Sequence, residues 1–367
     1  MKHTYELKRT VSTIVRQPNA RGIIKLAQDV HAHSIVSCVQ EEGLQPKPPR
    51  KTDPRTHLDR VAECVARSQK VYSCYEAGPT GFALHRELMA LGVENIVIAP
   101  TCLDERGRRV NNDKSDTIAL AVKLDRYVAG NKKVFTVVRV PSMEEEQRRA
   151  WTRHYKQLQT QRLSVASQGR TLALTQGHAI SNLWWQAKAW KFHQGMLPAW
   201  VIEHLEVFRR IILVIDAEMD QIQKRVVADR KSRKQAQPKW AGDWSLEVIE
   251  SEVCEWGRFN SWRKAGSYCG LTGGVSASGQ SHSDLSITKV GNRRLRAALI
   301  EMAWRIAREQ PNYWLSKKWA HILGPKAKVH GRLRKRAIVA FARQLFVDLW
   351  RWKTGRITAE KLGWEMV

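Results

Sequence analysis

The sequence has 367 residues, of which 43% are hydrophobic and 26% charged, so it describes a globular protein long enough for more than one hydrophobic core. Lys and Arg number 62 against 35 Asp and Glu, and the resulting charge of +27 favours a polyanionic partner, nucleic acid above all. The sequence has no run of about 18 uncharged apolar residues, no apolar segment typical of a secretory signal, and no C-x-x-C spacing among its 6 Cys. These features exclude a membrane-spanning helix and predict a soluble, cytoplasmic protein without a zinc site or a disulfide framework.

Positive charge and tryptophan are both concentrated toward the C-terminus. Residues 256–367 hold 22 Lys and Arg against 6 Asp and Glu, and all 15 Trp lie at or after Trp151. The two shifts predict an N-terminal domain that is separate from the rest, with the nucleic-acid-binding surface in the C-terminal part. Charge that serves solubility alone and an anionic membrane surface are the alternatives.

The N-terminal part predicts a polar arm at 1–20 and an α/β domain at 21–135. Apolar strands alternate there with helices after an opening hairpin, which indicates a mixed sheet. In chain order we expect strands at 23–30 and 34–40, a proline-containing loop at 41–56, a helix at 57–68, a strand at 70–76, a helix opened by the turn at 78–81, a strand at 94–100 and a helix from about Asn112.

The sequence from residue 142 to the C-terminus predicts all-α structure. Residues 142–236 contain two long, charged, mostly uninterrupted segments that we interpret as helices of a coiled-coil pair, separated by a stretch that contains Gly169, Gly177, Gly195 and Pro198. Residues 240–367 form a helical, basic domain, in which 294–306 has one apolar and one charged face and 336–352 is a further helix.

Four acidic residues stand at the predicted boundaries of the N-terminal elements. Asp29 and Glu76 end two of the apolar strands, and Asp113 and Asp116 are three residues apart at a helix start, so they point to the same side. Acids placed in this way can converge on one or two divalent cations. Because hard oxygen ligands suit Mg²⁺, which polarises a scissile phosphate, the pattern predicts a magnesium site.

Each acid also has an ordinary structural explanation. The two on the helix could be a cap and an acid of the first turn, which the helix dipole favours, and the other two could close a strand or start a turn. The histidines of the first turn, His31 and His33, are expected to be solvated turn residues and not ligands.

A loop of small residues is expected within 265–296. Its backbone N–H groups could approach a phosphate closely, and Ser278, next to a glycine, could be exposed on a turn. A serine nucleophile would exchange one phosphodiester for a phosphoserine ester of similar energy, so DNA strands could be rejoined without ATP. A flexible loop without chemistry is the alternative. The cations that follow at a helix start, where phosphate binding is favoured, are Lys289, Arg293, Arg294 and Arg296.

Two motifs carry a resemblance to a known family. They are E-A-G-P-T-G at 76–81, followed by D-K-S-D at 113–116, and G-L-T-G-G-V-S-A-S-G at 270–279, followed by I-T-K-V-G-N-R-R-L-R at 287–296. The sequence resembles the DEDD transposases of bacterial insertion sequences, the one-ten family (IS116/IS110/IS902 type), also called bridge-RNA-guided recombinases. The resemblance covers most of residues 23–130 and 240–310.

The resemblance implies a RuvC-like (ribonuclease H-like) N-terminal domain in which Asp29, Glu76, Asp113 and Asp116 bind the metal. It implies that Ser278 is the nucleophile, with Ala277 in place of the usual preceding serine. Relatives are implied to assemble as oligomers, here a homodimer that forms a tetramer, and many are guided by a structured RNA that the element encodes.

We therefore expect a bacterial, nucleoid-associated DNA transposase and recombinase that acts on donor and target DNA. It would use Mg²⁺, a covalent phosphoserine intermediate and a guide RNA, with 142–236 as the oligomerisation region. A metal-dependent nuclease that uses water and a nucleic-acid-binding protein without catalysis are the alternatives. Trp184, Trp185 and Trp190 either stack on bases or pack between helices.

Overall fold

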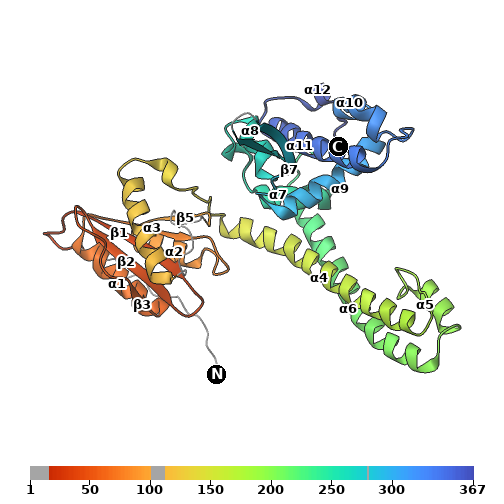
Figure 1. Cartoon of the computed structure of the whole chain (residues 1–367), viewed down its shortest axis with the longest axis horizontal. Helices are drawn as coiled ribbons and strands as arrows, with labels where there is room; N and C mark the ends of the chain where they lie inside the picture. The colour runs from red at the N-terminus through yellow and green to blue at the C-terminus, as the bar shows by residue number, and fades with distance from the viewer. Residues whose placement is uncertain (1–15, 101–111, 279–280) are drawn as a thin grey trace. The chain divides into compact units, whose positions relative to one another are not determined.

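The computed structural model describes residues 16–100, 112–278 and 281–367, with the backbone alone described at 275–278 and 281–284. Most of the polar arm expected at 1–20 lies outside these residues. The chain divides into two compact units, Met1–Val140 and Pro141–Val367 (Figure 1). Within the described ranges, no helix is both long and apolar enough to cross a bilayer.

The first unit is built on a five-stranded mixed sheet in the order β3-β2-β1-β4-β5. The central strand β1 runs antiparallel to β2, which pairs antiparallel with β3, and runs parallel to β4, which pairs parallel with β5. This confirms the predicted mixed α/β domain. The strands are β1 (Ile23–Val30), β2 (Ile35–Glu41), β3 (Arg50–Thr52), β4 (Lys70–Glu76) and β5 (Glu94–Ile98).

Helices cover both faces of this sheet: α1 (Pro54–Arg67) and α2 (Ala83–Ala90) on one, α3 (Asp113–Val128) on the other. Alternate residues of β1 point to opposite faces, so Leu26 packs with α1 and α2 while Ala27 packs with α3. A short 3-10 helix, Lys132–Val134, follows α3.

The prediction of a loop over residues 41–56 is wrong for the second half of that range. β3 adds a short edge strand there, and α1 begins earlier than expected because Asp53 caps it. The Asp53 carboxylate accepts hydrogen bonds from the backbone N–H groups of Arg55 and Thr56, both at 3.0 Å. Pro54 at the first helical position costs no hydrogen bond.

The second unit opens with the two long helices that the sequence predicts, α4 (Met143–Thr175) and α6 (Ala199–Ser232). They run side by side as a helical hairpin closed by α5 (Ala187–Gln194) (Figure 1). Gly169 was expected between the two long helices, but it lies inside α4. A Cβ atom at Gly169 would collide with the ring of Trp184, so the glycine makes room for the tryptophan.

The tryptophans of this hairpin belong to its core. Trp184, Trp185 and Trp190 are buried to within 4% of full burial among side chains of α4 and α6. Trp184 donates to the carbonyl of Ala166 at 3.0 Å, and Trp185 to the Asp216 carboxylate at 3.0 Å. These rings pack helices together, and the stacking alternative does not hold for this structure.

The C-terminal helices share one large core with the serine segment at its edge. The loop of small residues expected within 265–296 is wrong, because residues 273–278 and 281–287 form a two-stranded β-hairpin there, whereas the helix start expected after it is present. The elements are α7 (Asp243–Val253), a 3-10 turn (Trp256–Arg258), α8 (Trp262–Tyr268), β6 (Gly273–Ser278), β7 (Ser281–Ile287), α9 (Arg293–Glu309), α10 (Trp314–Leu323), α11 (Gly331–Lys353) and α12 (Ala359–Leu362).

Candidate functional site

The four acids lie at the edge of the first unit where β1 and β4 end. The last paired residues of these parallel strands are Gln28 and Tyr75, so Asp29 and Glu76 follow them on neighbouring strands. Asp113 is the first residue of α3, which packs across β1. Asp116 lies one turn further along the same helix.

A histidine joins two of these acids. Nε2 of His31 lies 3.3 Å from Oδ2 of Asp29 and 3.4 Å from Oδ2 of Asp113. The ligand atoms of these three residues all lie within 4.8 Å of one another, which is compatible with a shared metal ion, and Glu76 and Asp116 stand outside this group of three. His31 is exposed in the turn as predicted, with 47% of its side chain accessible, but it also belongs to the acidic cluster.

The electrostatics of the cluster favour a cation. Burial raises the pKa of Asp29, and the carboxylates of Asp113 and Asp116 raise it further, while His31 acts in the opposite direction. Mutual repulsion among acids is relieved by a bound cation, and carboxylate oxygens are the donors that Mg²⁺ prefers. The donor set at this sheet edge therefore fits a divalent cation.

The capping alternative for the acids on α3 is not what the structure has. Asn112 is the N-cap of α3, and its side chain accepts from the backbone N–H of Lys114 at 3.1 Å. Asp113 and Asp116 follow inside the first turn, where the helix dipole favours them, so this second part of the alternative is confirmed. Capping by Asn112 leaves both carboxylates available to the cluster.

Ser278 lies at the tip of the hairpin in the second unit. It is the last residue of β6 and pairs with Ser281, the first residue of β7. Its side chain lies outside the described residues, as do residues 279–280. The backbone register therefore places this serine at a turn, as predicted. The turn belongs to a β-hairpin and not to an irregular loop.

The segment after the hairpin is held tightly against the end of α8. Gly291 has a φ of 140°, and a Cβ atom there would lie 2.8 Å from the backbone nitrogen of Gly270. Arg296 donates to the backbone carbonyls of Cys269 at 3.2 Å and Lys289 at 3.1 Å. These contacts give a physical reason for the K-V-G-N-R spacing, and they assign Arg296 a positioning role.

The start of α9 is fixed by a polar chain that reaches back to α4. Asn292 caps α9 by accepting from the N–H groups of Arg294 and Leu295, and its amide donates to the Glu252 carboxylate at 2.7 Å. Arg153 donates to both oxygens of the same carboxylate at 2.8 Å. Burial alone would raise the pKa of Glu252, but the hydrogen bonds from Arg153 and Asn292 outweigh it and lower that pKa.

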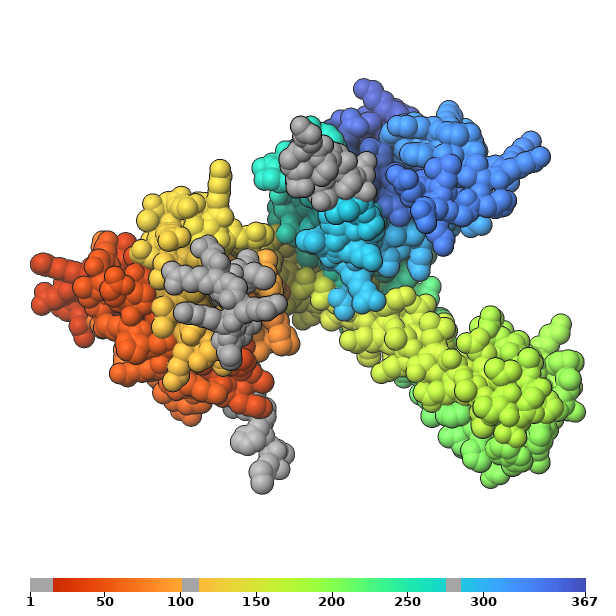
Figure 2. Space-filling model, viewed as in Figure 1, coloured from red at the N-terminus to blue at the C-terminus, as the bar shows by residue number. Residues whose placement is uncertain are grey.

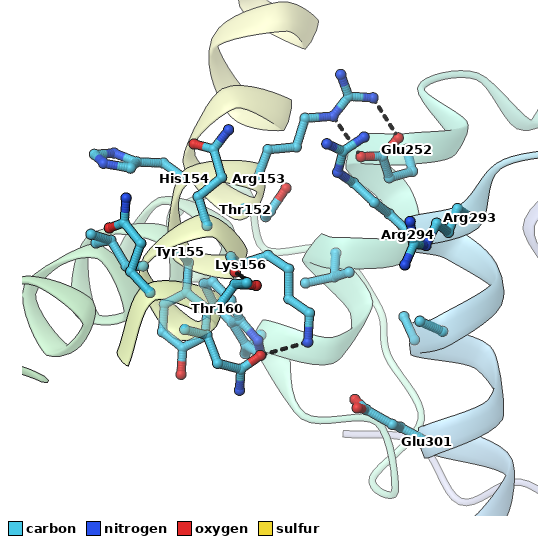
Figure 3. A pocket seen from close by; sticks show the side chains of 18 residues that line it. Thr152, Arg153, His154, Tyr155, Lys156, Thr160, Glu252, Arg293, Arg294 and Glu301 are labelled. Atoms are coloured by element: carbon cyan, nitrogen blue, oxygen red, sulfur yellow. Dashed lines mark hydrogen bonds and ion pairs between the residues drawn. The ribbon is translucent and has the colours of Figure 1, made fainter. Parts of the chain in front are cut away.

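A groove of about 1060 Å³ lies beside this chain, between α4, α7 and α9. Figure 3 shows Arg153 and Lys156 of α4 on one wall and Arg293, Arg294 and Glu301 of α9 on the other. Arg293 and Arg294 are exposed, and no ion pair is described for either among the residues of the structure. The predicted cations of α9 therefore open onto a basic groove whose other wall sequence reasoning missed, since α4 is more than a hundred residues away.

Comparisons with known proteins identify the family of the chain. The family model described as "Transposase IS116/IS110/IS902 family" matches residues 242–320. The chain is 30% identical to the putative transposase y4rJ of Sinorhizobium fredii (strain NBRC 101917 / NGR234), over 78% of this chain and 77% of the relative. It is 32% identical to the putative transposase y4qE of the same organism, over 66% of this chain and 60% of the relative. It is 36% identical to the transposase for insertion sequence element IS1533 of Leptospira borgpetersenii over a shorter stretch, 18% of this chain and 20% of the relative. The chain therefore belongs to the IS116/IS110/IS902 family of transposases.

Proposed function

We propose that this transposase cleaves and exchanges DNA strands by a Mg²⁺-dependent reaction that passes through a phosphoserine at Ser278. The observation that carries the proposal is the acidic cluster of Asp29, His31 and Asp113 at the end of the central strand. A transposase of this family acts on DNA, which a protein of charge +27 attracts. The acidic sheet edge repels DNA phosphates unless a cation is bound there.

A RuvC-like (ribonuclease H-like) fold is proposed for the first unit. Its support is the mixed sheet with order β3-β2-β1-β4-β5, in which the antiparallel half comes first and a helix links each later parallel strand. In this fold the site forms at the ends of the first and fourth strands, where Asp29 and Glu76 lie.

The metal ligands in this proposal are Asp29, Glu76, Asp113 and Asp116. Bound Mg²⁺ would polarise the scissile phosphate and stabilise its entering and leaving oxygens. The protein positions the carboxylates from three separate elements, β1, β4 and α3, and holds His31 between two of them.

In the covalent step the Oγ atom of Ser278 bonds to phosphorus, and one bond from phosphorus to a deoxyribose oxygen breaks. The serine proton leaves with a base, and the released deoxyribose oxygen takes up a proton. One phosphate ester replaces another, so attack by a hydroxyl of a second strand can reverse the step without an energy source. Lys289, Arg293 and Arg294 would hold the phosphate charge.

Oligomer formation is proposed for the helical region 142–236. The helix α6 has two apolar stripes: one packs on α4, and a second contains Trp200, Val207, Ile211 and Val214, each at least 44% exposed. Spacings of seven, four and three residues along this stripe match a coiled-coil seam. A second copy of the chain is the proposed partner, forming a homodimer and then a tetramer. A guide RNA that selects donor and target DNA, and work at the nucleoid in the cytoplasm, complete the proposal.

The test is a trapping experiment with the purified full chain. Labelled DNA carrying the ends of the element is incubated with protein and Mg²⁺, with added co-purifying RNA, and denatured in detergent. We expect a protein–DNA adduct that Ser278→Ala and EDTA each abolish, while Ser281→Ala retains it. Cleavage without any adduct would point instead to a nuclease that uses water, and binding without cleavage to a protein that has lost catalysis.

A further inference from the structure

The helices at the C-terminus carry a concentration of positive charge that is separate from the start of α9. Between Glu309 and Asp348 the sequence has 9 Lys and Arg and no acidic residue. Two of them lie in the turn between α10 and α11 and four in the first turns of α11, at the outer edge of the second unit (Figures 1 and 2). We name this surface the α10–α11 corner, made of Lys326, Lys328, Arg332, Arg334, Lys335 and Arg336.

Most cations of the corner are not held by contacts with acids of the fold. Five are exposed and only Arg334 is half-buried, and the described part of the chain gives none of the six an ion pair. Elsewhere in the same unit, cationic side chains form ion pairs with acids, as Arg153 does with Glu252 and Lys353 with Glu250. Clustered like charges repel one another, so a surface of this kind is stabilised by an anionic ligand.

Local geometry directs these charges outward as a group. Arg332, Lys335 and Arg336 are three and four residues apart, so they share one side of the first turns of α11. Arg334 points the other way, with its guanidinium 5.4 Å from the ring centre of Trp304 on α9. The N-cap residue His330 makes no capping hydrogen bond through its side chain, so the first N–H groups of this 23-residue helix add positive partial charge beside the cations.

The corner lies toward the far end of the helix that carries the predicted phosphate ligands. Arg293 and Trp304 are eleven residues apart, close to three turns, so they lie on one side of α9 about 16 Å apart along its axis. Duplex DNA carries one phosphate charge per roughly 1.7 Å of its axis. A duplex that runs along this side would therefore present several phosphates to both ends of α9.

We propose that the α10–α11 corner binds the phosphate backbone of duplex DNA without reading its sequence. All six residues of the corner lie beyond residues 242–320, which the family model matches. The proposal rests on DNA as the substrate of a transposase and adds a second contact to the one proposed at Lys289, Arg293 and Arg294. It does not depend on the phosphoserine step.

The experiment compares two variants that each remove four positive charges from exposed side chains. The corner variant combines K326Q, K328Q, R332Q and K335Q, and it keeps Arg334 on Trp304. The control variant combines K188Q, K191Q, K231Q and K234Q, which lie on the α4–α6 side of the same unit. Binding of the full chain to a DNA duplex of arbitrary sequence is measured by fluorescence anisotropy over a range of salt concentrations, without Mg²⁺.

The corner variant should bind about 10-fold or more weakly, and the slope of log K against log salt should flatten by roughly 2 to 4. The control should keep a slope close to that of the wild type. Equal effects of the two variants would mean that DNA binding depends on the total charge of the protein and not on the corner, and they would overturn the proposal. If the corner variant unfolds, the double variant K326Q/K328Q in the turn gives the same comparison with half the expected change.

One further arm separates the possible outcomes. Binding to an RNA hairpin is measured in parallel, and a loss confined to RNA would overturn the assignment to DNA. The assay contains no Mg²⁺ and involves no cleavage. Failure of the phosphoserine mechanism therefore leaves the result for the corner unchanged.

Discussion

The two units of this transposase use charge in opposite ways. In the first, carboxylates from β1 and α3 gather at one sheet edge, where burial and the charges of Asp113 and Asp116 raise the pKa of Asp29, and His31 lies between Asp29 and Asp113. In the second, cations fall into two groups: Arg153 and Arg230 are paired with buried acids, whereas Arg293 and Arg294 of α9 and five of the six cations of the α10–α11 corner are exposed. A charged side chain that is paired with an opposite charge inside the fold stabilises the structure. A charged side chain whose neighbours carry the same charge is available to bind a ligand.

The comparison predicts the largest effect for the acids of the first unit. Asp29→Asn removes one charge without changing the shape of the side chain, so DNA cleavage should fall by at least about 100-fold. Stability should not fall with it, since the change relieves repulsion from Asp113 and Asp116. Cleavage of labelled element ends and hydrogen exchange of the first unit measure the two quantities. A stability loss with cleavage retained would make Asp29 a structural residue.

The buried cations of the second unit should behave in the reverse manner. Arg230 is 2% exposed and lies 2.5 Å from Glu250 and 3.3 Å from Glu247, so Arg230→Ala removes one of the two cations paired with each of these buried acids and leaves only Lys353 and Arg233. The free energy of unfolding should fall by about 3–5 kcal/mol. All Trp lie in this unit, so urea denaturation followed by Trp fluorescence reports it selectively.

A matched control lies on the same helix. Lys224 pairs with Asp220 in the open, where their side chains are 75% and 61% exposed. Lys224→Ala should therefore shift the denaturation midpoint far less than Arg230→Ala. Similar shifts would mean that burial does not separate structural from exposed charge in this unit.

The sequence predicted those parts of the fold that depend on local patterns. Apolar runs bounded by turns located the four longer strands of the first unit, and long uninterrupted stretches located α4 and α6. The short strand β3 has no apolar residue and was missed. The hairpin of β6 and β7 was missed because Gly and Ser are poor strand formers in isolation, and its pairing is supplied by the partner strand.

The candidate site was predictable only where its residues end elements of secondary structure. Asp29, Glu76 and Asp113 could be placed at strand or helix ends from the sequence, and their proximity follows from parallel strands. The contact of His31 with two acids depends on the path of one turn, for which no pattern exists. The groove beside α9 depends on Arg153 reaching Glu252, a tertiary contact that no local signal announces.

A third prediction concerns a buried titratable group of the first unit that takes no part in the acidic edge. Burial, with a smaller effect of Arg60, lowers the pKa of His57 to about 4, and its Nε2 lies 3.0 Å from Oε1 of Gln28. The unfolded chain binds a proton here below about pH 6.5, so the stability that neutral His57 gives is complete above that pH. It should be lost as the pH falls to 4, by about 3 kcal/mol.

Hydrogen exchange of the first unit at pH values from 7 to 4.5 measures this loss, corrected for the intrinsic exchange rate. His57→Gln cannot titrate in this range, so its stability should change less with pH than that of the wild type. Parallel pH profiles for the two proteins would contradict a neutral, buried His57.

The smallest effect is expected where the second unit uses shape in place of charge. Gly169 lies inside α4, where an alanine would ordinarily favour the helix by up to about 1 kcal/mol. Here a Cβ atom collides with the Trp184 ring, which is fully buried and tied to the Ala166 carbonyl, so the ring cannot turn away. Overpacking of this kind costs about 1–3 kcal/mol, and it should exceed the gain in helix propensity. Gly169→Ala should therefore lower the urea midpoint followed by Trp fluorescence, while Gln168→Ala, on the exposed side of the same turn, should not. A more stable Gly169→Ala protein would show that the glycine is an unused helix breaker and that Trp184 is not packed against it.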